Sequence, residues 1–328
     1  MKKYFFIVFI LLLISGALFV YNKITHRDIQ KNQAQISNDT SVTGTIKHSI
    51  ALDEIFDGGV GKDGIPSIDN PKFISTDEAD MFLDGESLGL GFSWKGESRF
   101  YPFQIMVWHE IVNDQIQGDP MLVTYCPLCQ TGIVFDPKVD GKALTFGVSG
   151  KLWRSNLLMY DRESGSLWSQ VLGEAVVGPQ TGKKLKVLAF DVIYYGNWKK
   201  AHPDTKVLSR ETGIFKKYGE DPYKDYYSDK TVGFGATLND TRLHPKEFIL
   251  GIELNGKYKA YRADAIKNIS SLQDTFSGEH IEISKDEFGQ VRVYRLSENK
   301  LMPFIGSFWF AWLAVHPDTE LFSEGLPR

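Results

Sequence analysis

Two signatures occur twice in this chain, in the same order each time. The first is Gly-x4-Gly-x4-Tyr, found at 91–101 and again at 251–261. The second is Trp-x3-His-Pro-Asp-Thr, found at 198–205 and again at 312–319. The stretch between the two signatures is longer in the first half than in the second. We therefore expect a duplicated β module, with the Cys126–Cys129 segment and its neighbours elaborating the first copy.

The segments around these signatures are short, apolar or alternating, and Gly, Asp and Asn separate them. Such runs are typical of strands joined by turns. Strands are predicted at 121–125, 133–135, 144–148, 157–160, 166–171, 174–177 and 248–254. Asn255-Gly256 predicts a hairpin turn, and 162–165 reads as a hairpin loop. Short helices are expected at Thr76–Leu83, with a Thr cap, and near 104–108, 196–201 and 263–268. The predicted fold class is mainly β, a β-rich α+β protein.

The N-terminus differs from the rest of the chain. After Lys2 and Lys3, the run from Tyr4 to Tyr21 has no charged residue. It is nearly long enough, as a helix, to cross a hydrocarbon core of about 30 Å. We expect residues 1–27 to be a signal anchor or transmembrane helix, with a cleaved signal peptide as the alternative. The short basic start favours a membrane-anchored protein with its body on the extracytoplasmic side, and a reversed, cytoplasmic body is the other possibility.

The remaining sequence divides by composition. Residues 28–49 are polar and lack aromatic side chains after the anchor, so they are predicted to be a flexible tether. The β-rich body is expected at 50–328, with a first half at about 88–209, a connection at 210–247 and a second half at 248–328. The net charge of −4 and pI of about 6.0 argue against a nucleic-acid partner, which would need a basic surface.

The chain has two cysteines, and they form the motif Cys126-Pro-Leu-Cys129. Two cysteines make neither a disulfide framework nor a four-thiolate metal site. No helix pattern follows Cys129, so we expect the pair on a turn between two strands, as in one knuckle of a rubredoxin or zinc-ribbon site. Three interpretations stay open for the pair: metal binding, thiol–disulfide exchange, and a purely structural pair of packed thiols or a staple.

A metal site would need further ligands. Zinc would take two more, and copper(I) is satisfied by sulfur ligands with Met or His. His109 is the nearest histidine in sequence, and Met159, like Met121, is a thioether that could complete the shell. None has a diagnostic spacing, and a single His or Met in an apolar run is more often a packing residue.

A dense polar and aromatic cluster follows the cysteines between 146 and 170. Such residues on adjacent strands can line a polar cleft with aromatic walls. The candidate ligand-binding residues are Ser149, Arg154, Asn156, Asp161, Arg162, Trp168 and Gln170. In a redox site, Arg154 or Arg162 could also lower a thiol pKa. The alternative is a bend permitted by glycine, with buried polar groups that the backbone satisfies.

Two histidine motifs complete the candidates. The duplicated His202 and His316 elements are expected to cap helices or turn the chain, because Pro restricts the residue before it. In the connection, Arg242 and Lys246 of the Arg-Leu-His-Pro-Lys-Glu group could bind an anionic ligand or form a salt-bridge clasp between the halves.

With these motifs in view, the chain resembles a bacterial and archaeal family catalogued as domain of unknown function 3179. The resemblance covers roughly residues 60–325. It is carried by Thr124–Gly132, Phe146–Gly150, Leu158–Arg162, Ser166–Gln170 and His244–Glu247. It implies an exported or anchored protein, and it implies no activity.

The predicted function is that of a membrane-anchored extracytoplasmic protein, in which Cys126 and Cys129 bind zinc or copper or exchange disulfides. The N-terminal helix would bind the membrane, and the protein or small-molecule partner is left open, as is whether the protein is an enzyme. The alternative is a non-catalytic binding protein, whose Trp/Arg/Ser/Asn cleft holds a glycan or small anion while the cysteines are only structural.

Overall fold

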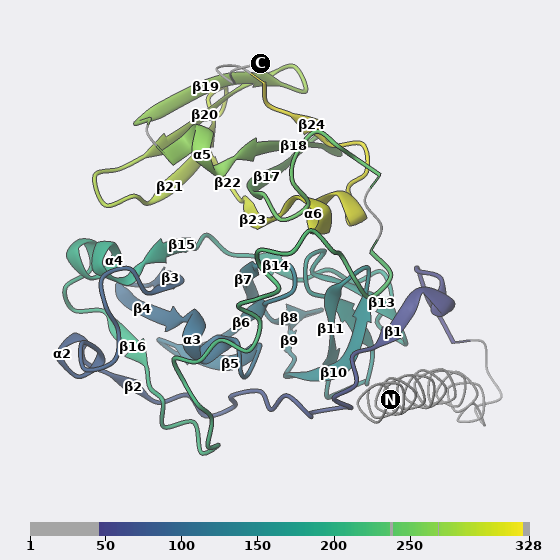
Figure 1. The fold of residues 1–328 in the computed structure, drawn as a ribbon, viewed down its shortest axis with the longest axis vertical. Helices are drawn as coiled ribbons and strands as arrows, with labels where there is room; N and C mark the ends of the chain where they lie inside the picture. The colour runs from purple at the N-terminus through teal and green to yellow at the C-terminus, as the bar shows by residue number, and fades with distance from the viewer. Residues whose placement is uncertain (1–45, 237–238, 268, 324–328) are drawn as a thin grey trace, which may run out of the picture. The chain divides into compact units, whose positions relative to one another are not determined.

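A computed structural model describes residues 46–236, 239–267 and 269–323, and this part of the chain is mainly β, as the sequence predicts (Figure 1). Five sheets of four or five strands hold nearly all of the strands. We name each sheet by a central strand: the β3 sheet (order β15-β3-β4-β16-β2), the β6 sheet (β14-β7-β6-β5), the β10 sheet (β1-β10-β11-β12-β13), the β17 sheet (β23-β17-β18-β24) and the β20 sheet (β19-β20-β21-β22).

The β3 and β6 sheets and their helices make up the first half. Their elements are β2 (Phe73–Ile74), α2 (Thr76–Ala79), β3 (Leu88–Trp94), β4 (Glu97–Pro102), α3 (Phe103–Met106), β5 (Ile111–Ile116), β6 (Asp119–Cys126), β7 (Thr131–Asp136), β14 (Lys186–Val187), β15 (Asp191–Tyr194), α4 (Tyr195–Ala201) and β16 (Lys206–Leu208).

The β17 and β20 sheets make up the second half. Their elements are β17 (Phe248–Leu254), β18 (Lys257–Arg262), α5 (Ala263–Lys267), β19 (Ser271–Phe276), β20 (Glu279–Lys285), β21 (Val291–Arg295), β22 (Lys300–Met302), β23 (Ile305–Phe308), α6 (Trp309–Val315) and β24 (Glu320–Leu321).

The two halves share one topology and one register. β15 pairs antiparallel with β3 as β23 pairs with β17, and β16 pairs parallel with β4 as β24 pairs with β18. The aligned pairs agree residue by residue, for example Val207 beside Phe100 and Leu321 beside Ala260. The β6 and β20 sheets match in the same way, strand for strand.

The first signature and the second meet in space, which explains why they recur together. Trp198 packs on Gly91, where an added Cβ would lie 2.3 Å from the indole, and Trp312 packs on Gly251, where the gap would be 2.5 Å. Each indole N–H donates to the hydroxyl of its own HPDT threonine, at 2.8 Å and 2.9 Å. The glycine therefore makes room for a buried tryptophan that the threonine orients.

The tyrosine of the first signature has a matching partner in each half. The hydroxyl of Tyr101 donates to Asp114 at 2.6 Å, and that of Tyr261 donates to Asp274 at 2.7 Å. Each carboxylate also binds a cation from the strand that carries the tyrosine, at 2.5 Å in both halves (Arg99 and Lys259). These buried pairs leave no carboxylate uncompensated.

The first half carries an insertion between β7 and β14. It consists of the hairpin β8 (Lys138–Val139) and β9 (Lys142–Ala143), and of β10 (Phe146–Trp153), β11 (Asn156–Asp161), β12 (Leu167–Ser169) and β13 (Glu174–Val177). η1 (Leu52–Glu54) leads into β1 (Ile55–Asp57), which extends the β10 sheet. The Cys126–Cys129 turn itself joins β6 to β7, in the part that both halves share, so the expectation that it belongs to the elaboration is wrong.

Most predicted elements are present, with adjusted ends. β13, β17 and the strand–turn–strand setting of the cysteines match the predictions, and Asn255-Gly256 forms the hairpin turn with positive φ at both residues. The predicted Thr76 cap is wrong, because Ser75 caps α2 in a capping box with Glu78. The strand expected from Leu144 begins only at Phe146. α6 has no counterpart among the predictions.

The N-terminal predictions fall mostly outside the described residues. The anchor at 1–27 and nearly all of the tether at 28–49 lie there. Order begins before residue 50, because His48 bridges Val177 at the edge of the β10 sheet. In the described part of the chain, no helix is long and apolar enough to span a bilayer.

The connection contains neither helix nor strand among its described residues, 210–236 and 239–247. It still packs closely, because Tyr223, Tyr226 and Tyr227 lie against the main hydrophobic core. Such a long ordered segment without secondary structure is uncommon, and in compact proteins it is usually functional.

Candidate functional site

The cysteine turn is a tight connection in the β6–β7 hairpin. Cys126 ends β6 opposite Thr131, and the Cys129 amide donates to the Cys126 carbonyl at 3.2 Å. Gln130 then takes a positive φ of 48°, which turns the chain back into β7. No helix begins at the cysteine turn itself, but the Phe308 amide, at the N-cap of α6, donates to the Cys129 carbonyl at 2.9 Å.

Both thiols are free and inaccessible. Cys126 is 1% exposed and Cys129 is 0% exposed, and they do not form a disulfide. Their Sγ atoms share one acceptor, the carbonyl of Ser155, at 3.9 Å and 3.3 Å. The two sulfurs thus point together toward the β10–β11 turn, where Arg154 and Ser155 both take positive φ.

A buried amide network supports Cys129. Asn156 Nδ2 donates to its Sγ at 3.6 Å and to Gln170 Oε1 at 3.0 Å. The Gln170 amide in turn donates to Thr124 Oγ1 and to the Thr131 carbonyl, both at 3.0 Å. Thr124 belongs to β6 and Thr131 to β7. Buried hydrogen bonds therefore link the inserted segment to the cysteine hairpin.

The two thiols differ in acidity. Burial raises the pKa of the Cys126 thiol, but hydrogen bonds from Cys129 and from backbone amides outweigh it, so the net pKa lies below its ordinary value. Burial and the neighbouring Cys126 raise the pKa of Cys129 well above the ordinary value. A thiolate in this pair therefore resides on Cys126, with Cys129 as its donor.

A buried carboxyl group lies beside the pair. Glu110 precedes β5, and its carbonyl accepts from the amide of Tyr125, the residue before Cys126. Burial, and then the charge of Cys126, raise the pKa of Glu110 well above its ordinary value. The neutral form of this side chain is therefore favoured, which avoids a second negative charge next to a thiolate.

The connection covers the turn. Tyr226 donates through its hydroxyl to the Leu128 carbonyl at 3.0 Å. Ser155 donates through its amide to the Phe234 carbonyl at 3.0 Å, and through its hydroxyl to the Gly233 carbonyl. We call residues 223–236 the covering segment. The same Ser155 that receives both thiols also holds this segment in place.

One predicted metal ligand, His109, is engaged away from the cysteines. Both ring nitrogens of His109 have other partners, the Pro66 carbonyl at 2.7 Å and the Tyr218 hydroxyl at 2.6 Å. Met159 is buried in β11, in the same core as the thiols. Within the described ranges, no group of three or more His, Cys, Asp or Glu side chains is arranged to hold a metal ion.

Only two of the predicted ligand-binding residues, Asn156 and Gln170, contact the cysteine site. Ser149 Oγ bonds the Leu158 carbonyl and the Lys151 amide at a bulge in β10. Asp161 accepts from the Trp168 indole at 2.8 Å and caps the β11–β12 loop through Ser164.

The two candidate arginines are engaged elsewhere. Arg154 binds Glu54 at 3.3 Å and the Ala314 carbonyl at 2.5 Å, and Arg162 pairs with Asp69 at 3.0 Å. The predicted clasp in the connection is also absent from the described residues, since Arg242 pairs with Asp240 and Glu247 pairs with Arg262. Charged side chains here fix loops rather than facing the thiols.

Sequence reasoning missed Ser155, Glu110 and Tyr226. Ser155 stands inside the polar cluster, but its role depends on its backbone carbonyl, which a sequence does not report. Glu110 and Tyr226 come from distant parts of the chain. A carboxylate directly after an apolar run, as in Ile105–His109, was the available signal for Glu110.

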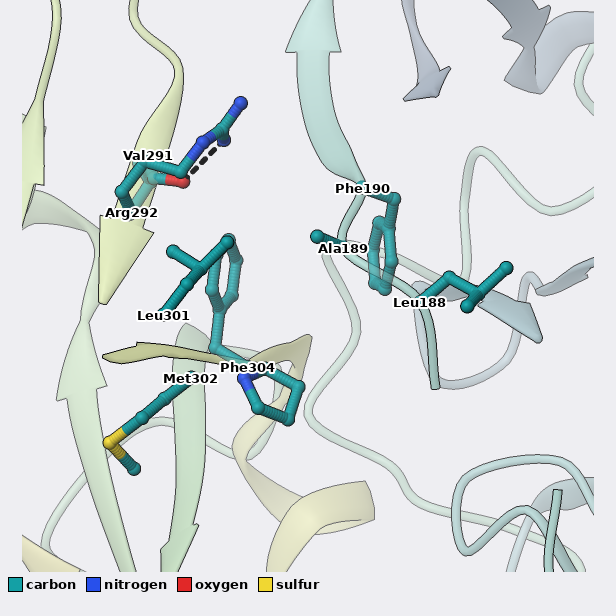
Figure 2. A pocket seen from close by; sticks show the side chains of 9 residues that line it. Leu188, Ala189, Phe190, Val291, Arg292, Leu301, Met302 and Phe304 are labelled. Carbon is teal, nitrogen blue, oxygen red and sulfur yellow. Dashed lines mark hydrogen bonds between the residues drawn. The ribbon is translucent and has the colours of Figure 1, made fainter. Parts of the chain in front are cut away.

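Figure 2 shows a small cavity at the junction of the halves, where Phe190 faces Leu301 and Phe304. Its volume of about 10 Å³ leaves room for one water molecule at most. His202 and Asp191 bond Gln290 nearby, and Asp191 also binds Arg292 at 2.5 Å, so this junction is a structural contact.

Comparison with known proteins gives one match. No curated protein and no solved structure matches the chain. A family described as "Protein of unknown function (DUF3179)" matches residues 62–302, which include the β3 and β6 sheets, strands β10 to β13 and the cysteine site. Two of the segments that carry the resemblance meet at this site, because Thr124–Gly132 forms the turn and Ser166–Gln170 supplies Gln170. The chain belongs to the DUF3179 family.

Proposed function

We propose that Cys126 and Cys129 form a redox centre that cycles between dithiol and disulfide. The observation that carries this proposal is the shared Ser155 acceptor, which holds two free thiols side by side with different acidities. The described residues supply no third ligand from His, Cys, Asp or Glu, which makes a zinc site the weaker proposal.

The exchange follows from these roles. The Cys126 thiolate attacks one sulfur of a partner disulfide, that S–S bond breaks, and one partner thiolate leaves. Cys129 then gives up its proton and attacks the Cys126 sulfur, which forms the internal disulfide and releases the second partner thiolate. Two electrons pass from the pair to the partner disulfide, and the Cys129 proton goes to one of the two released thiolates, so atoms, electrons and charge balance.

Access requires the covering segment to move, because thiols that are 0–1% exposed cannot meet a partner. Oxidation would remove both S–H donors from the Ser155 carbonyl. Ser155 also donates hydrogen bonds to the Phe234 and Gly233 carbonyls of the covering segment. A change in the redox state of the cysteines would therefore act on Ser155, and through it on the closure of this segment. A locally weak segment of this kind opens more easily than the sheets below it.

We also propose that the apolar run at 4–21 anchors the protein in a membrane, with the body on the extracytoplasmic side. Disulfides persist in such compartments, which suits a cycling pair. The matched topology of the halves supports an origin by duplication. The second copy has Asp286 where the first has Cys126, so the redox role would belong to the first copy alone.

The proposal is tested by trapping the mixed disulfide. Full-length chain carrying Cys129→Ser retains the nucleophile but lacks the resolving thiol, so it should accumulate a mixed disulfide with glutathione when given oxidised glutathione. The matched Cys126→Ser variant should accumulate at least about tenfold less. Equal trapping by both variants, or none by either, would contradict the assignment of Cys126 as the attacking thiol.

A further inference from the structure

A second cavity, of about 620 Å³, lies where the two halves meet. The first half contributes Leu88 from β3 and Ile193 from β15, and the second contributes Phe248, Leu250 and Ile266 from β17 and α5. Its volume is within the range of small-molecule sites, which are mostly apolar with a few polar groups. It is distinct from the cysteine site, because neither thiol lines it.

Cationic side chains surround this apolar lining. Lys246, Lys267 and Lys285 all border the cavity, and none forms an ion pair with a carboxylate of the described residues. Lys246 is buried and donates to the Tyr226 carbonyl, and Lys285 donates to the Lys267 carbonyl. Their ammonium groups are thus hydrogen-bonded but not neutralised.

The two carboxylates at the cavity, Glu247 and Asp264, both bind Arg262, which does not line the cavity. This one guanidinium offsets one of the two negative charges, and the three lysines outweigh the other. The local net charge is therefore positive. An apolar interior beside uncompensated ammonium groups complements a molecule with an aliphatic chain and an anionic head.

The second half differs from the first at the residue that opens this space. α3 begins with Phe103, which stacks on Tyr125 with ring centroids 4.1 Å apart. The equivalent first residue of α5 is Ala263, which lines the cavity. A small residue here leaves room that an aromatic side chain fills in the other copy.

We propose that this cavity binds an aliphatic carboxylate, with the chain against Leu250 and Ile266 and the carboxylate near Lys267 and Lys285. The site is independent of the redox function. Gln130 lines the cavity directly after Cys129, but neither cysteine lines it, and both sulfurs contact the Ser155 carbonyl instead.

The test is calorimetric titration of full-length protein, in non-ionic detergent, with octanoate, hexanoate and octan-1-ol, each corrected for a detergent-only titration. Octanoate should bind in one-to-one ratio, hexanoate more weakly by roughly threefold or more per lost methylene, and octanol more weakly than octanoate. No saturable octanoate binding, or octanol binding as tightly as octanoate, overturns the proposal.

Variants assign the site. Lys267→Gln with Lys285→Gln should weaken octanoate about tenfold and leave octanol unchanged. Ala263→Phe should abolish binding of both by filling the space. The matched control, exposed Lys257→Gln with Lys300→Gln, should change neither. Cys126→Ser should bind octanoate normally, which separates this site from the redox proposal. An Ala263→Phe protein that still binds octanoate normally contradicts the assigned cavity.

Discussion

The β6–β7 and β20–β21 turns occupy equivalent places in the two halves but do different things. In the first, Cys126 and Cys129 are sealed beneath Ser155 and the covering segment. In the second, Asp286 caps its own turn by accepting from the Phe288 and Gln290 amides at 3.0 Å and 2.9 Å. The same strand topology therefore carries a buried cysteine pair in the first half and a self-contained turn in the second.

The inserted β10 sheet accounts for the difference. Ser155, Asn156 and Gln170 all come from this insertion, and all act on the cysteine turn. The second half has no such sheet, and its turn uses a local carboxylate instead of distant partners. The site is thus built by an addition to a shared module.

The largest expected effect is a loss of folding stability in each half, where a tryptophan packs on a glycine. Gly91→Ala and Gly251→Ala should each destabilise the protein by about 1–3 kcal/mol, because each Cβ would overlap a tryptophan packed against the strand. Urea unfolding of both variants measures this. If the two halves are equivalent, the two losses should be similar; a neutral Gly251→Ala beside a costly Gly91→Ala would refute equivalent packing.

The next effect distinguishes the cysteine turn of the first half from the equivalent turn of the second half. Asn156→Ala should cost about 1–3 kcal/mol, because it leaves the Gln170 oxygen and the Val171 amide without their buried partner. It should also raise the pKa of Cys129 further by removing a donor, which a thiol alkylation rate measured against pH would report. Asp286→Ala, in the other turn, should cost less and leave thiol reactivity unchanged.

A smaller effect concerns the cover. Tyr226→Phe removes one hydrogen bond to Leu128, so the covering segment should open more often. The loss of about 1 kcal/mol predicts roughly fivefold faster alkylation of the cysteines, measured by mass spectrometry. Tyr258→Phe in the second half is the matched control. Unchanged alkylation in Tyr226→Phe would mean that this segment does not limit access.

The smallest effect is a pH dependence at Glu110. Its folded-state pKa is raised, so the neutral form stabilises the fold fully below the unfolded pKa, and stability is lost as pH rises from there toward the folded value. Glu110→Gln removes this dependence, so its stability relative to the native protein should rise from pH 4 to pH 8. Parallel stability curves for the two proteins would show that Glu110 does not titrate abnormally.

Local patterns predicted much of the fold. Alternation located most strands, and Asn255-Gly256 located a turn whose two positive φ angles only such residues adopt easily. α6 was missed because residues 309–315 are apolar on all sides and show no helical face. The repeated Trp-x3-HPDT signature could have indicated this helix, because Trp198, the equivalent of Trp312, lies in α4.

The site was predictable only in part. The cysteine turn followed from the short apolar runs on either side of it. Asn156 and Gln170 were among the candidates, but nothing local separates them from Asp161 and Trp168, which bond each other. The covering segment contacts the turn across about a hundred residues of sequence, for example between Tyr226 and Leu128, and it has no periodicity to interpret.

The central claim is that the cysteine pair in the first copy cycles between dithiol and disulfide. The most direct measurement equilibrates full-length protein in dithiothreitol buffers of graded potential, traps the thiols with a maleimide under denaturing conditions, and counts them by mass, with metal analysis in parallel. The account predicts one reversible two-electron transition, with both thiols lost together and no stoichiometric metal. Thiols that stay reduced at every potential, or one tightly held zinc or copper ion per chain, would contradict it.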